Sequence, residues 1–519
     1  MDTTPSANLH ADPEKALGEE SVEDIHVSSD SSSSHDVLPL HVPETVSRWH
    51  KTIESIRGLE ARGISRVPPS ERVAPSLAND IQIVMLWYSA NITANNLGVG
   101  FLGPLLFDLG FLDSALLVVF GCLLGSLGPA YTAIWGPQSG HRTMVIARYF
   151  MGYWPSKLIA VLNIILMIGY VVISCIIGGQ ILSAVSGGSM SVVVGIVIIA
   201  LITWTIAVFG MTPFHVYERW AWIPQTLVLF ILIGSAGPHF NTSLPSTGNS
   251  ATIAANRLSF FALQLSVPVS WTGAGSDFFV YYPERIAKWK VFAMTFIGLS
   301  LSFIFVNLLA VGLASGVGSN ADWDAAYSTS SGALILAGYD GLGGFGKLCG
   351  VIIALGLCTN NVPGTYAASL DFQALGKIWK AIPRYFWVTV ATIIYFVCAV
   401  AGRDHLFLIF QNFLALMAYW VVIFITIVLE EHTIFKSHRN FDWAAYEDKS
   451  KLPIGLAALA AFLIGWVGPI VGMYQVWWTG PAAARLGDSG GDLGIWLGIG
   501  FTAVVFPPLR WAELRFVGR

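Results

Sequence analysis

Long apolar stretches recur along the chain from about residue 79 to its C-terminus, and short polar connections separate them. Most of these stretches reach the roughly 20 residues that an α-helix needs to cross the hydrocarbon layer of a bilayer. The pattern therefore predicts a polytopic chain with about 12 transmembrane helices. We place these helices at residues 79–108, 112–135, 158–185, 189–209, 219–238, 259–281, 290–316, 343–371, 385–401, 404–429, 453–477 and 493–514.

The first 75 residues lack this pattern. They are polar, contain few aromatic residues, and include a run over residues 28–34 in which every residue except Asp30 is serine. A segment of this composition cannot bury enough apolar surface to fold. We therefore expect a disordered cytoplasmic tail over residues 1–75 and a transmembrane domain over residues 76–519.

Composition supports an all-α membrane protein. Hydrophobic residues make up 54% of the chain and charged residues only 12%, whereas soluble domains carry about 25% charged residues. The lipid bilayer is therefore an expected partner. The net charge of −4 gives no reason to expect a nucleic-acid partner. The five cysteines lie in apolar runs without metal-ligand spacing, so we expect no metal site and no cofactor.

The charges of the connections orient the predicted helices. Cytoplasmic connections of membrane proteins are enriched in lysine and arginine. With twelve spans and both termini in the cytoplasm, fourteen basic residues would be internal and four external. The internal ones are Arg142, Arg148, Lys157, Arg219, Arg285, Lys288, Lys290, Lys377, Lys380, Arg384, Lys436, Arg439, Lys449 and Lys451. The external ones are Arg257, Lys347, Arg403 and Arg485.

Two of the predicted spans are poor continuous helices. The first contains three asparagines and two glycines within residues 89–100, and the sixth contains Pro268 and two glycines within residues 266–277. Either segment alone fits a kinked helix in close contact with its neighbours. However, spans one and six each open a block of five. Interrupted helices at matching positions favour a five-plus-five inverted repeat and a secondary transporter.

Polar and aromatic side chains near these breaks are candidates for binding a solute. Asn360 and Asn361 bring carboxamide donors and acceptors without charge into the eighth span, although intramembrane asparagines also cross-link helices. Trp271, beside the second break, offers a face on which a planar ring can stack, or it packs in the core. These groups suit a neutral heterocycle.

Asp277 is the most deeply placed carboxylate in the predicted spans. An ionisable group at this depth is a candidate proton carrier. Two structural roles compete with this interpretation: Asp277 could cap a half-helix, or it could pair with a basic residue at the cytoplasmic mouth.

Three segments resemble the fungal purine–cytosine permeases, a branch of the nucleobase–cation symporter family. They are Trp-Tyr-Ser-Ala-Asn at residues 87–91, the stretch 271–283 with its Asp277, and Asn-Asn-Val-Pro-Gly-Thr-Tyr at residues 360–366. The resemblance extends from about residue 60 to the C-terminus. It implies twelve spans, a leucine-transporter-like inverted repeat with helices 1 and 6 broken, and proton-coupled uptake at the plasma membrane.

The resemblance also assigns roles to individual residues. Ser89 matches a first-span serine near the substrate, and Trp271 matches the sixth-span aromatic that stacks on the substrate ring. Asn360 and Pro363 match the polar and the helix-breaking positions of the eighth span.

Three positions differ from the purine and cytosine carriers. Tyr170 stands in place of a third-span tryptophan, Ser174 in place of an asparagine four residues later, and Gly364 in place of an asparagine after Pro363. Residues four apart share a helix face, so Tyr170 can still stack on a ring. Ser174 and Gly364 lack the paired donor and acceptor of an amide. Selectivity should therefore differ, because unmatched polar groups cost most in dry sites.

The leading hypothesis is a proton symporter that imports cytosine or a purine. The base would bind between Tyr170 and Trp271, with Ser89, Ser174 and Asn360 reading its edges. Further predicted binding residues are Asn361, Pro363 and Gly364.

Three alternatives differ in substrate or in class. A symporter of another planar heterocycle such as vitamin B6 would share the site, and a solute sensor would bind without net flux. An intramembrane enzyme would need paired carboxylates or a histidine constellation inside the spans, so we expect no enzymatic activity. Sodium coupling would need a ring of oxygens between spans one and eight, where only Thr359 stands out. The sequence is compatible with an oligomer.

Overall fold

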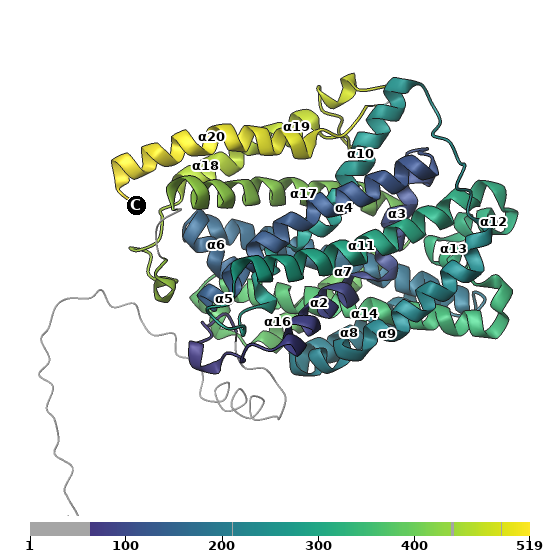
Figure 1. Cartoon of the computed structure of the whole chain (residues 1–519), viewed down its shortest axis with the longest axis horizontal. Helices are drawn as coiled ribbons and strands as arrows, with labels where there is room; N and C mark the ends of the chain where they lie inside the picture. The colour runs from purple at the N-terminus through teal and green to yellow at the C-terminus, as the bar shows by residue number, and fades with distance from the viewer. Residues whose placement is uncertain (1–62, 210, 437–440, 489) are drawn as a thin grey trace, which may run out of the picture. The chain divides into compact units, whose positions relative to one another are not determined.

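The chain folds into long α-helices, most of which run roughly alongside one another (Figure 1). The computed structural model describes residues 63–209, 211–436, 441–488 and 490–519. Within these ranges no strand forms, apart from an isolated bridge between Tyr474 and Thr479. The all-α prediction is confirmed.

The helices follow the predicted apolar stretches. The first half contains η1 (Pro69–Glu71), α2 (Leu77–Asn91), α3 (Ala94–Leu106), α4 (Phe111–Ala133), α5 (Trp135–Ser139), α6 (Thr143–Met151), α7 (Pro155–Val185), α8 (Val192–Phe209) and α9 (Met211–Ala236). The next part contains α10 (Ser250–Val269), η3 (Ser270–Gly273), η4 (Gly275–Phe278), α11 (Lys288–Gly316), α12 (Ala321–Thr329), α13 (Ser331–Ala337) and α14 (Gly343–Ala374). The chain ends with α15 (Lys377–Ala381), α16 (Arg384–Gly402), α17 (Leu406–Glu430), the π-helical turn η7 (Glu431–Phe435), α18 (Leu456–Gly465), α19 (Val467–Gly472) and α20 (Gly494–Val517).

Nine helices in the described ranges are long and apolar enough to cross a membrane. The three other predicted spans correspond to interrupted or more polar helices, namely α2 with α3, α10 with η3 and η4, and α18 with α19. Their interruptions explain why they do not count as continuous apolar helices. The number of twelve crossings stays a prediction.

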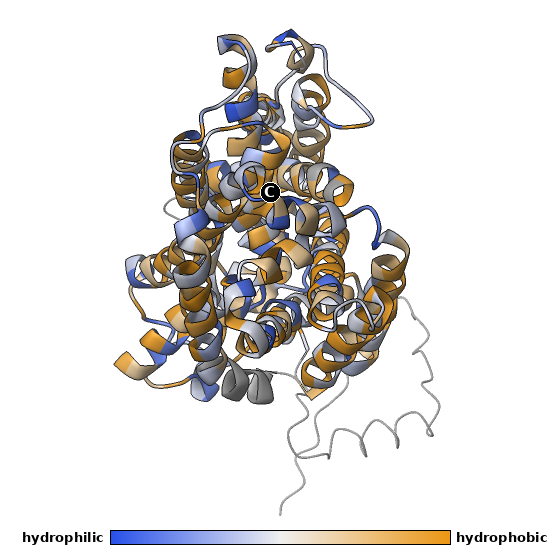
Figure 2. Cartoon of the chain, turned by 90° about the vertical axis from the view of Figure 1, so that its right-hand side faces the viewer, coloured by the Kyte–Doolittle hydropathy of each residue, from blue (hydrophilic) through white to orange (hydrophobic). Residues whose placement is uncertain are grey.

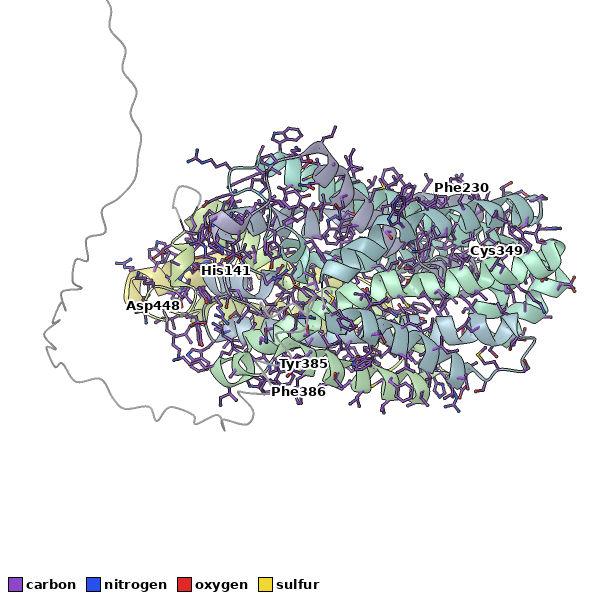
Figure 3. The ribbon with its side chains drawn as sticks, turned by 90° about the horizontal axis from the view of Figure 1, so that it is seen from below. His141, Phe230, Cys349, Tyr385, Phe386 and Asp448 are labelled. Carbon is purple, nitrogen blue, oxygen red and sulfur yellow. The ribbon has the colours of Figure 1, made fainter. Side chains whose placement is uncertain are left out.

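The outer helices present apolar side chains to their surroundings. The most apolar window of α8 is only 33% buried inside the protein, whereas that of α7 is 72% buried. Figure 2, in which many helices are seen close to end-on, shows hydrophobic residues on their outward faces as well as their inward ones. Phe230 and Phe386 lie on the outside of the bundle in Figure 3 and are 57% and 47% exposed. A helix that is apolar all round needs an apolar solvent on its outer side, which a bilayer supplies.

The first predicted break lies between α2 and α3. Ile92 closes α2, and Thr93 opens α3 in extended conformation, with φ −108° and ψ 156°. The hydroxyl of Thr93 donates to Asn95 Oδ1 at 2.5 Å, so the side chains of the break bond each other locally. The polar run at residues 89–100 therefore splits one membrane span into two half-helices.

The second predicted break follows α10. The α-helix ends at Val269, just after Pro268, and continues as the short 3-10 turns η3 and η4. A Cβ on Gly273 would lie 2.0 Å from Asn163 Oδ1, and one on Gly275 would lie 2.4 Å from Thr132 Oγ1. Only glycine allows α4 and α7 to approach this backbone so closely. The two breaks confirm the expected interruption of helices 1 and 6.

An interruption was also expected at Pro363, and the structure corrects this. α14 continues through Pro363 to Ala374. A proline inside a helix removes one N–H donor, here the one that would reach the Thr359 carbonyl oxygen. The surrounding helices α7, α8 and α16 pack along α14 and hold it in one piece.

Residues 63–75 are ordered, although the sequence placed them in the tail. Val67 N donates to Gly140 O at 2.9 Å, and Val73 N donates to Tyr281 O at 2.9 Å. Arg66 Nε bonds Ser139 O at 2.9 Å, and Ile64 and Val67 are buried. We call residues 63–75 the strap, because these bonds fasten them to the α5–α6 connection and to the chain after η4. Residues 1–62 of the predicted tail lie outside the described ranges.

Candidate functional site

A small cavity lies where the two breaks meet α7, α11 and α14. Its volume is about 20 Å³, which is room for about one water molecule. No charged side chain lines it. The polar lining residues are Asn91, Asn95, Asn96, Tyr170, Ser270, Trp271 and Asn360.

Trp271 forms one wall of the cavity and is held rigidly. Its indole Nε1–H donates to Asn91 Oδ1 at 2.9 Å. The Trp87 ring packs edge-on against it, with centroids 5.6 Å apart and an interplanar angle of 81°. A buried indole whose N–H is already bonded can offer its face to a ring without losing side-chain freedom. Tyr170, on α7, is another wall and packs edge-on against Phe413 at 5.8 Å.

Helix α14 satisfies the carbonyl groups that the first break frees. Asn360 Nδ2 donates to Ala90 O at 2.8 Å, and Thr359 Oγ1 donates to Ser89 O at 3.0 Å. In lipid, freed backbone groups persist only where protein or a water-filled cavity bonds them. The polar residues of α14 therefore help to stabilise the break between α2 and α3.

Three carboxamide atoms remain free to bond a solute. Asn96 Nδ2 donates to Asn91 O at 2.7 Å, and Asn95 Oδ1 accepts from Thr93. These bonds leave Asn96 Oδ1, Asn95 Nδ2 and Asn360 Oδ1 without a partner among the described residues. Two acceptors and an NH₂ donor match the edge of a neutral ring that carries both N–H and C=O groups.

The structure brings together half of the binding residues named from the sequence. The cavity is lined by Tyr170, Trp271, Asn360 and Gly364. It is not lined by Ser89, Ser174, Asn361 or Pro363. Positions 360 and 364 are four apart and share a face of α14, whereas 361 and 363 lie on other faces. Asn361 Nδ2 accordingly points to α8 and bonds Thr203 Oγ1 at 3.5 Å.

Nine lining residues were not named individually from the sequence. The polar ones lie in the segments that were identified as breaks, so their composition carried the signal without showing which side chains face the cavity. Phe303 is one apolar residue in a uniformly apolar span, and nothing in the sequence distinguishes it. The nine are Asn91, Asn95, Asn96, Leu166, Met167, Val171, Val267, Ser270 and Phe303.

Asp277 lies in η4 and is 3% exposed. Its Oδ1 accepts from Thr143 N at 2.7 Å and from Thr143 Oγ1 at 3.0 Å. Arg142 Nη1 donates to the Asp277 backbone oxygen at 2.5 Å. The carboxylate thus fastens the end of the broken helix to the start of α6.

The end of the bundle at α5 and α6, which we call the α6 end, is covered by the strap and by residues 441–452. Arg148 Nη1 donates to Tyr446 O at 3.1 Å, and His141 Nε2 bonds Trp443 O at 2.7 Å. Burial lowers the pKa of His141 to about 4, so its ring is neutral at physiological pH. His141 and Asp448 mark this end in Figure 3.

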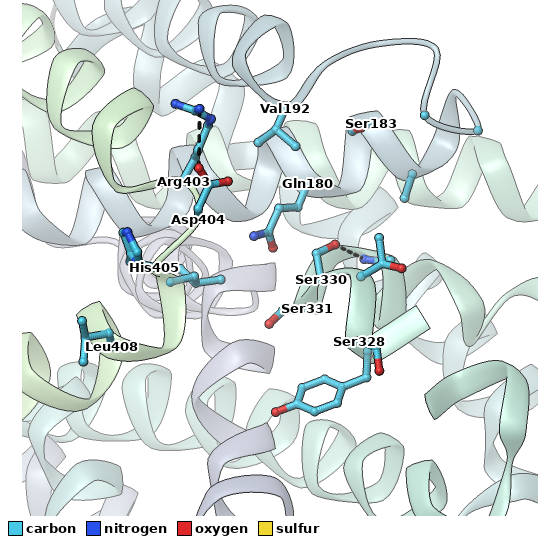
Figure 4. Close-up of a pocket in the computed structure, with 17 residues that line it drawn as sticks. Gln180, Ser183, Val192, Ser328, Ser330, Ser331, Arg403, Asp404, His405 and Leu408 are labelled. Atoms are coloured by element: carbon cyan, nitrogen blue, oxygen red, sulfur yellow. Dashed lines mark hydrogen bonds and ion pairs between the residues drawn. The ribbon is translucent and has the colours of Figure 1, made fainter. Parts of the chain in front are cut away.

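A second, larger cavity of about 880 Å³ lies at the opposite end, where α7 meets α12, α13 and the connection before α17. We call this the α12 end. Gln180, Ser330, Ser331 and His405 line it (Figure 4). Gln180 Oε1 accepts from Gly332 N at 3.3 Å. Tyr170 lies on α7 between this cavity and Asn163, so one helix connects the two ends of the bundle with the central cavity.

Two broken helices that cross at an uncharged cavity define a secondary transporter of the inverted-repeat class. The structure of Mhp1, a nucleobase-cation-symport-1 family transporter in a closed conformation with bromovinylhydantoin bound, has the same fold. It matches with a TM-score of 0.63 at 12% identity, over 88% of this chain and 96% of that one.

The chain belongs to the family described as permeases for cytosine/purines, uracil, thiamine and allantoin, whose pattern matches residues 66–494. It is 32% identical to the vitamin B6 transporter TPN1 of Saccharomyces cerevisiae, over 95% of this chain and 94% of that protein. It is 34% identical to the purine-cytosine permease fcyB of Emericella nidulans, over 89% and 90%. The resemblance to the fungal permeases is confirmed, and the protein is a membrane transporter rather than an enzyme.

Proposed function

We propose that this protein is a proton symporter that imports a nucleobase, cytosine or a purine, across the plasma membrane. The observation that carries the proposal is the central cavity. It has aromatic walls from Tyr170 and Trp271, free carboxamide atoms, and no charged side chain. A neutral planar heterocycle can stack on such walls and exchange hydrogen bonds with the amides, whereas an ion would lose its hydration without a counter-charge.

The cavity must widen to admit a base, because its volume of about 20 Å³ is far smaller than a pyrimidine ring. Substrate would enter from the large cavity at the α12 end and leave at the α6 end, after the strap and residues 441–452 move away. Rocking of one set of helices against the other around a fixed site gives this alternating access.

The basic connections support cytoplasmic termini. Arg142, Arg148 and Lys157 lie around α6, and Lys377 and Lys380 lie on α15. Because cytoplasmic connections are rich in lysine and arginine, we assign the α6 end to the cytoplasm. The α12 end would then face outward.

Bonding between α2 and α14 supports protons over sodium as the coupling ion. The carbonyl oxygens of Ser89 and Ala90 would be the natural cation ligands at the first break. They already accept from Thr359 Oγ1 and Asn360 Nδ2. A sodium ion would have to compete with both donors for these oxygens.

One observation favours vitamin B6 as a second candidate. A Cβ on Gly364 would meet only Val171 Cγ2 at 3.5 Å and Met167 O at 3.8 Å. This part of the wall has space for a methyl-sized group on a substrate ring and offers it no amide. The relative TPN1 is a vitamin B6 transporter.

Uptake of radiolabelled substrates tests the proposal. The full chain is expressed in yeast that lacks its own base and pyridoxine carriers, and cytosine, adenine, hypoxanthine, uracil and pyridoxine are compared at pH 5 and pH 7.5. We expect saturable uptake of cytosine or a purine that is faster at the lower pH. Uptake of pyridoxine alone would support the second candidate.

Two results would overturn the transport proposal. No saturable uptake of any of the five compounds, with the protein shown at the cell surface by a fluorescent tag, removes it. Binding of a base to purified protein without accumulation in cells or vesicles would instead indicate a solute sensor. Uptake that depends on a sodium gradient and does not change with pH would refute the proton as the coupling ion.

A further inference from the structure

A second buried carboxylate lies near Asp277. Asp371, near the end of α14, is 2% exposed. Its one hydrogen-bond partner among the described residues is Asn163, whose Nδ2 donates to Asp371 Oδ2 at 2.6 Å. Asp277, which interacts with it electrostatically, is also negative. An unpaired buried carboxylate is costly as an anion, and binding a proton removes that cost.

Asn163, on α7, links this carboxylate to the break in α10. The same Nδ2 that bonds Asp371 lies 3.3 Å from Gly273 O in the unwound turn η3. Its other carboxamide atom, Oδ1, is fully buried and has no hydrogen-bond partner among the described residues. An unsatisfied buried acceptor beside a carboxylate is a place for one more hydrogen.

Most charged groups around Asp371 are bound to other partners. Arg142 bonds the Asp277 backbone oxygen and the Tyr366 hydroxyl, at 2.5 and 2.7 Å. Arg148 of α6 bonds Ala374 O at 2.9 Å. Lys157 of α7 places its Nζ over the Tyr153 and Trp154 rings. On α15 lie Lys377 and Lys380, and Lys380 pairs with Glu447. Arg384 of α16 donates to Ala207 O and Val208 O. No ion pair joins any of them to Asp371 in the described ranges.

Asp277 is buried like Asp371 but differs from it in its hydrogen bonds and in its neighbouring positive charge. It accepts two hydrogen bonds from Thr143, and the guanidinium of Arg142 lies close by. These contacts stabilise a negative charge. Of the two carboxylates, Asp371 is therefore the one that gains more from a proton.

We propose that Asp371 takes up the coupling proton and that Asn163 transmits its binding to the break in α10. This inference rests on the proposed proton symport. A proton from water binds Asp371 Oδ2, and the new O–H donates to Asn163 Oδ1. This bond requires the carboxamide to turn about its own axis, which withdraws Nδ2 from Gly273 O. The turn also breaks the hydrogen bond from Asn163 Nδ2 to Asp371 Oδ2, and the new O–H is the one covalent bond that forms.

The turn of Asn163 ties proton binding to the substrate site. Gly273 follows Trp271 by two residues in the same 3-10 turn, so release of its carbonyl oxygen loosens the turn that carries the cavity wall. A proton and a substrate that act on one two-state element change each other's affinity by the same factor. Asp371 lies seven residues along α14 from Gly364, about 10 Å toward the α6 end, so the proton would not compete with the substrate for space.

Purified protein provides a test that needs no substrate. Infrared difference spectra between pH 5 and pH 8 report the carbonyl stretch of protonated carboxyl groups. Asp492, whose pKa burial raises to about 6, contributes a band of its own that stays in every variant tested here. We expect a further band in the wild-type protein that disappears in Asp371→Asn and remains in Asp277→Asn. The opposite result, or identical bands in wild-type protein and Asp371→Asn, would overturn the inference.

Uptake measurements separate this inference from the proposed function. In proteoliposomes with an inward proton gradient, wild-type protein should accumulate its substrate. Asp371→Asn should exchange substrate across the membrane but reach an inside-to-outside ratio of about 1, and Asp371→Glu should recover accumulation. If the wild-type protein transports no base, the proposed function is refuted. If the wild-type protein transports and Asp371→Asn still accumulates substrate with the gradient, only the role of Asp371 is refuted.

A second variant covers failure of Asp371→Asn to fold. Asn163→Ser keeps the carboxylate and removes the carboxamide that turns. We expect transport with a shifted pH midpoint and a lower accumulation ratio. A midpoint and a ratio equal to those of the wild-type protein would contradict the transmission through Asn163.

Discussion

Trp271 offers the most quantitative test of the binding site. Trp271→Ala removes an aromatic wall, and loss of one aromatic face under a base costs about 1–3 kcal/mol. Because 1.4 kcal/mol corresponds to a tenfold change in affinity, the substrate KM should rise about 5- to 150-fold. Trp271→Phe keeps a face but removes the N–H that donates to Asn91 Oδ1 at 2.9 Å. Leaving that buried acceptor unpaired costs about 1–3 kcal/mol, so this variant should also bind weakly.

Initial rates of uptake across a range of substrate concentrations give KM and maximal rate for both variants. Surface fluorescence of a tagged chain normalises the rates to the amount of protein. Trp289→Ala is a matched control, because Trp289 is 73% exposed at the start of α11 and does not line the cavity. A KM within twofold of the wild-type value in Trp271→Ala would refute stacking on this residue.

Three further predictions concern the breaks, the cavity wall and the α12 end. Asn360→Ala removes the donor to Ala90 O and should lower the free energy of unfolding by about 1–3 kcal/mol; an unchanged melting temperature of the purified protein would contradict this. Gly273→Ala should abolish transport because its Cβ would lie 2.0 Å from Asn163 Oδ1. Gly364→Ala should transport and should alter the order of substrate affinities in a competition panel. Equal transport activity of the two variants would contradict the close approach at η3. Burial raises the pKa of Asp492 to about 6, so the native state binds this proton more tightly than the unfolded chain does. The free energy of unfolding should therefore fall as pH rises from about 4 through 6, by about 3 kcal/mol in all. Melting temperatures from pH 4 to pH 7 should show this slope in wild-type protein but not in Asp492→Asn, and equal slopes would count against it.

The positions of the breaks could be predicted because their causes are local. Residues 89–100 combine asparagines with glycines, and residues 266–277 place two glycines after Pro268. Such residues weaken a helix wherever they stand. In the structure the α-helix is interrupted inside both segments, at Ile92 and Thr93 in the first and after Val269 in the second.

Which side chains face the cavity could not be predicted, because that depends on partners distant in the sequence. Asn360 and Asn361 are identical in type, yet one bonds Ala90 O at the first break and the other points to Thr203 on α8. Pro363 resembles the prolines of broken helices, but the packing of neighbouring helices keeps α14 continuous. Helix propensity is a weak guide where tertiary contacts are this extensive.

The order of residues 63–75 was missed for a similar reason. The strap has little apolar character along its length, and its stability comes from backbone bonds to Gly140 and Tyr281. Asp371 was also passed over in favour of Asp277, because depth along a predicted span says nothing about counter-charges. The hydrogen bonds from Thr143 to Asp277, and their absence at Asp371, become visible only in three dimensions.

The central claim is that a neutral heterocycle binds where the two broken helices meet α7 and α14. An experimental density map of the purified protein, prepared with the base or pyridoxine that it transports best, tests this directly. The account predicts a planar ligand against the Trp271 and Tyr170 rings, within hydrogen-bond distance of Asn360 Oδ1. Ligand density at another place, such as the large cavity beside Gln180 and Ser331, with none beside Trp271, would contradict it.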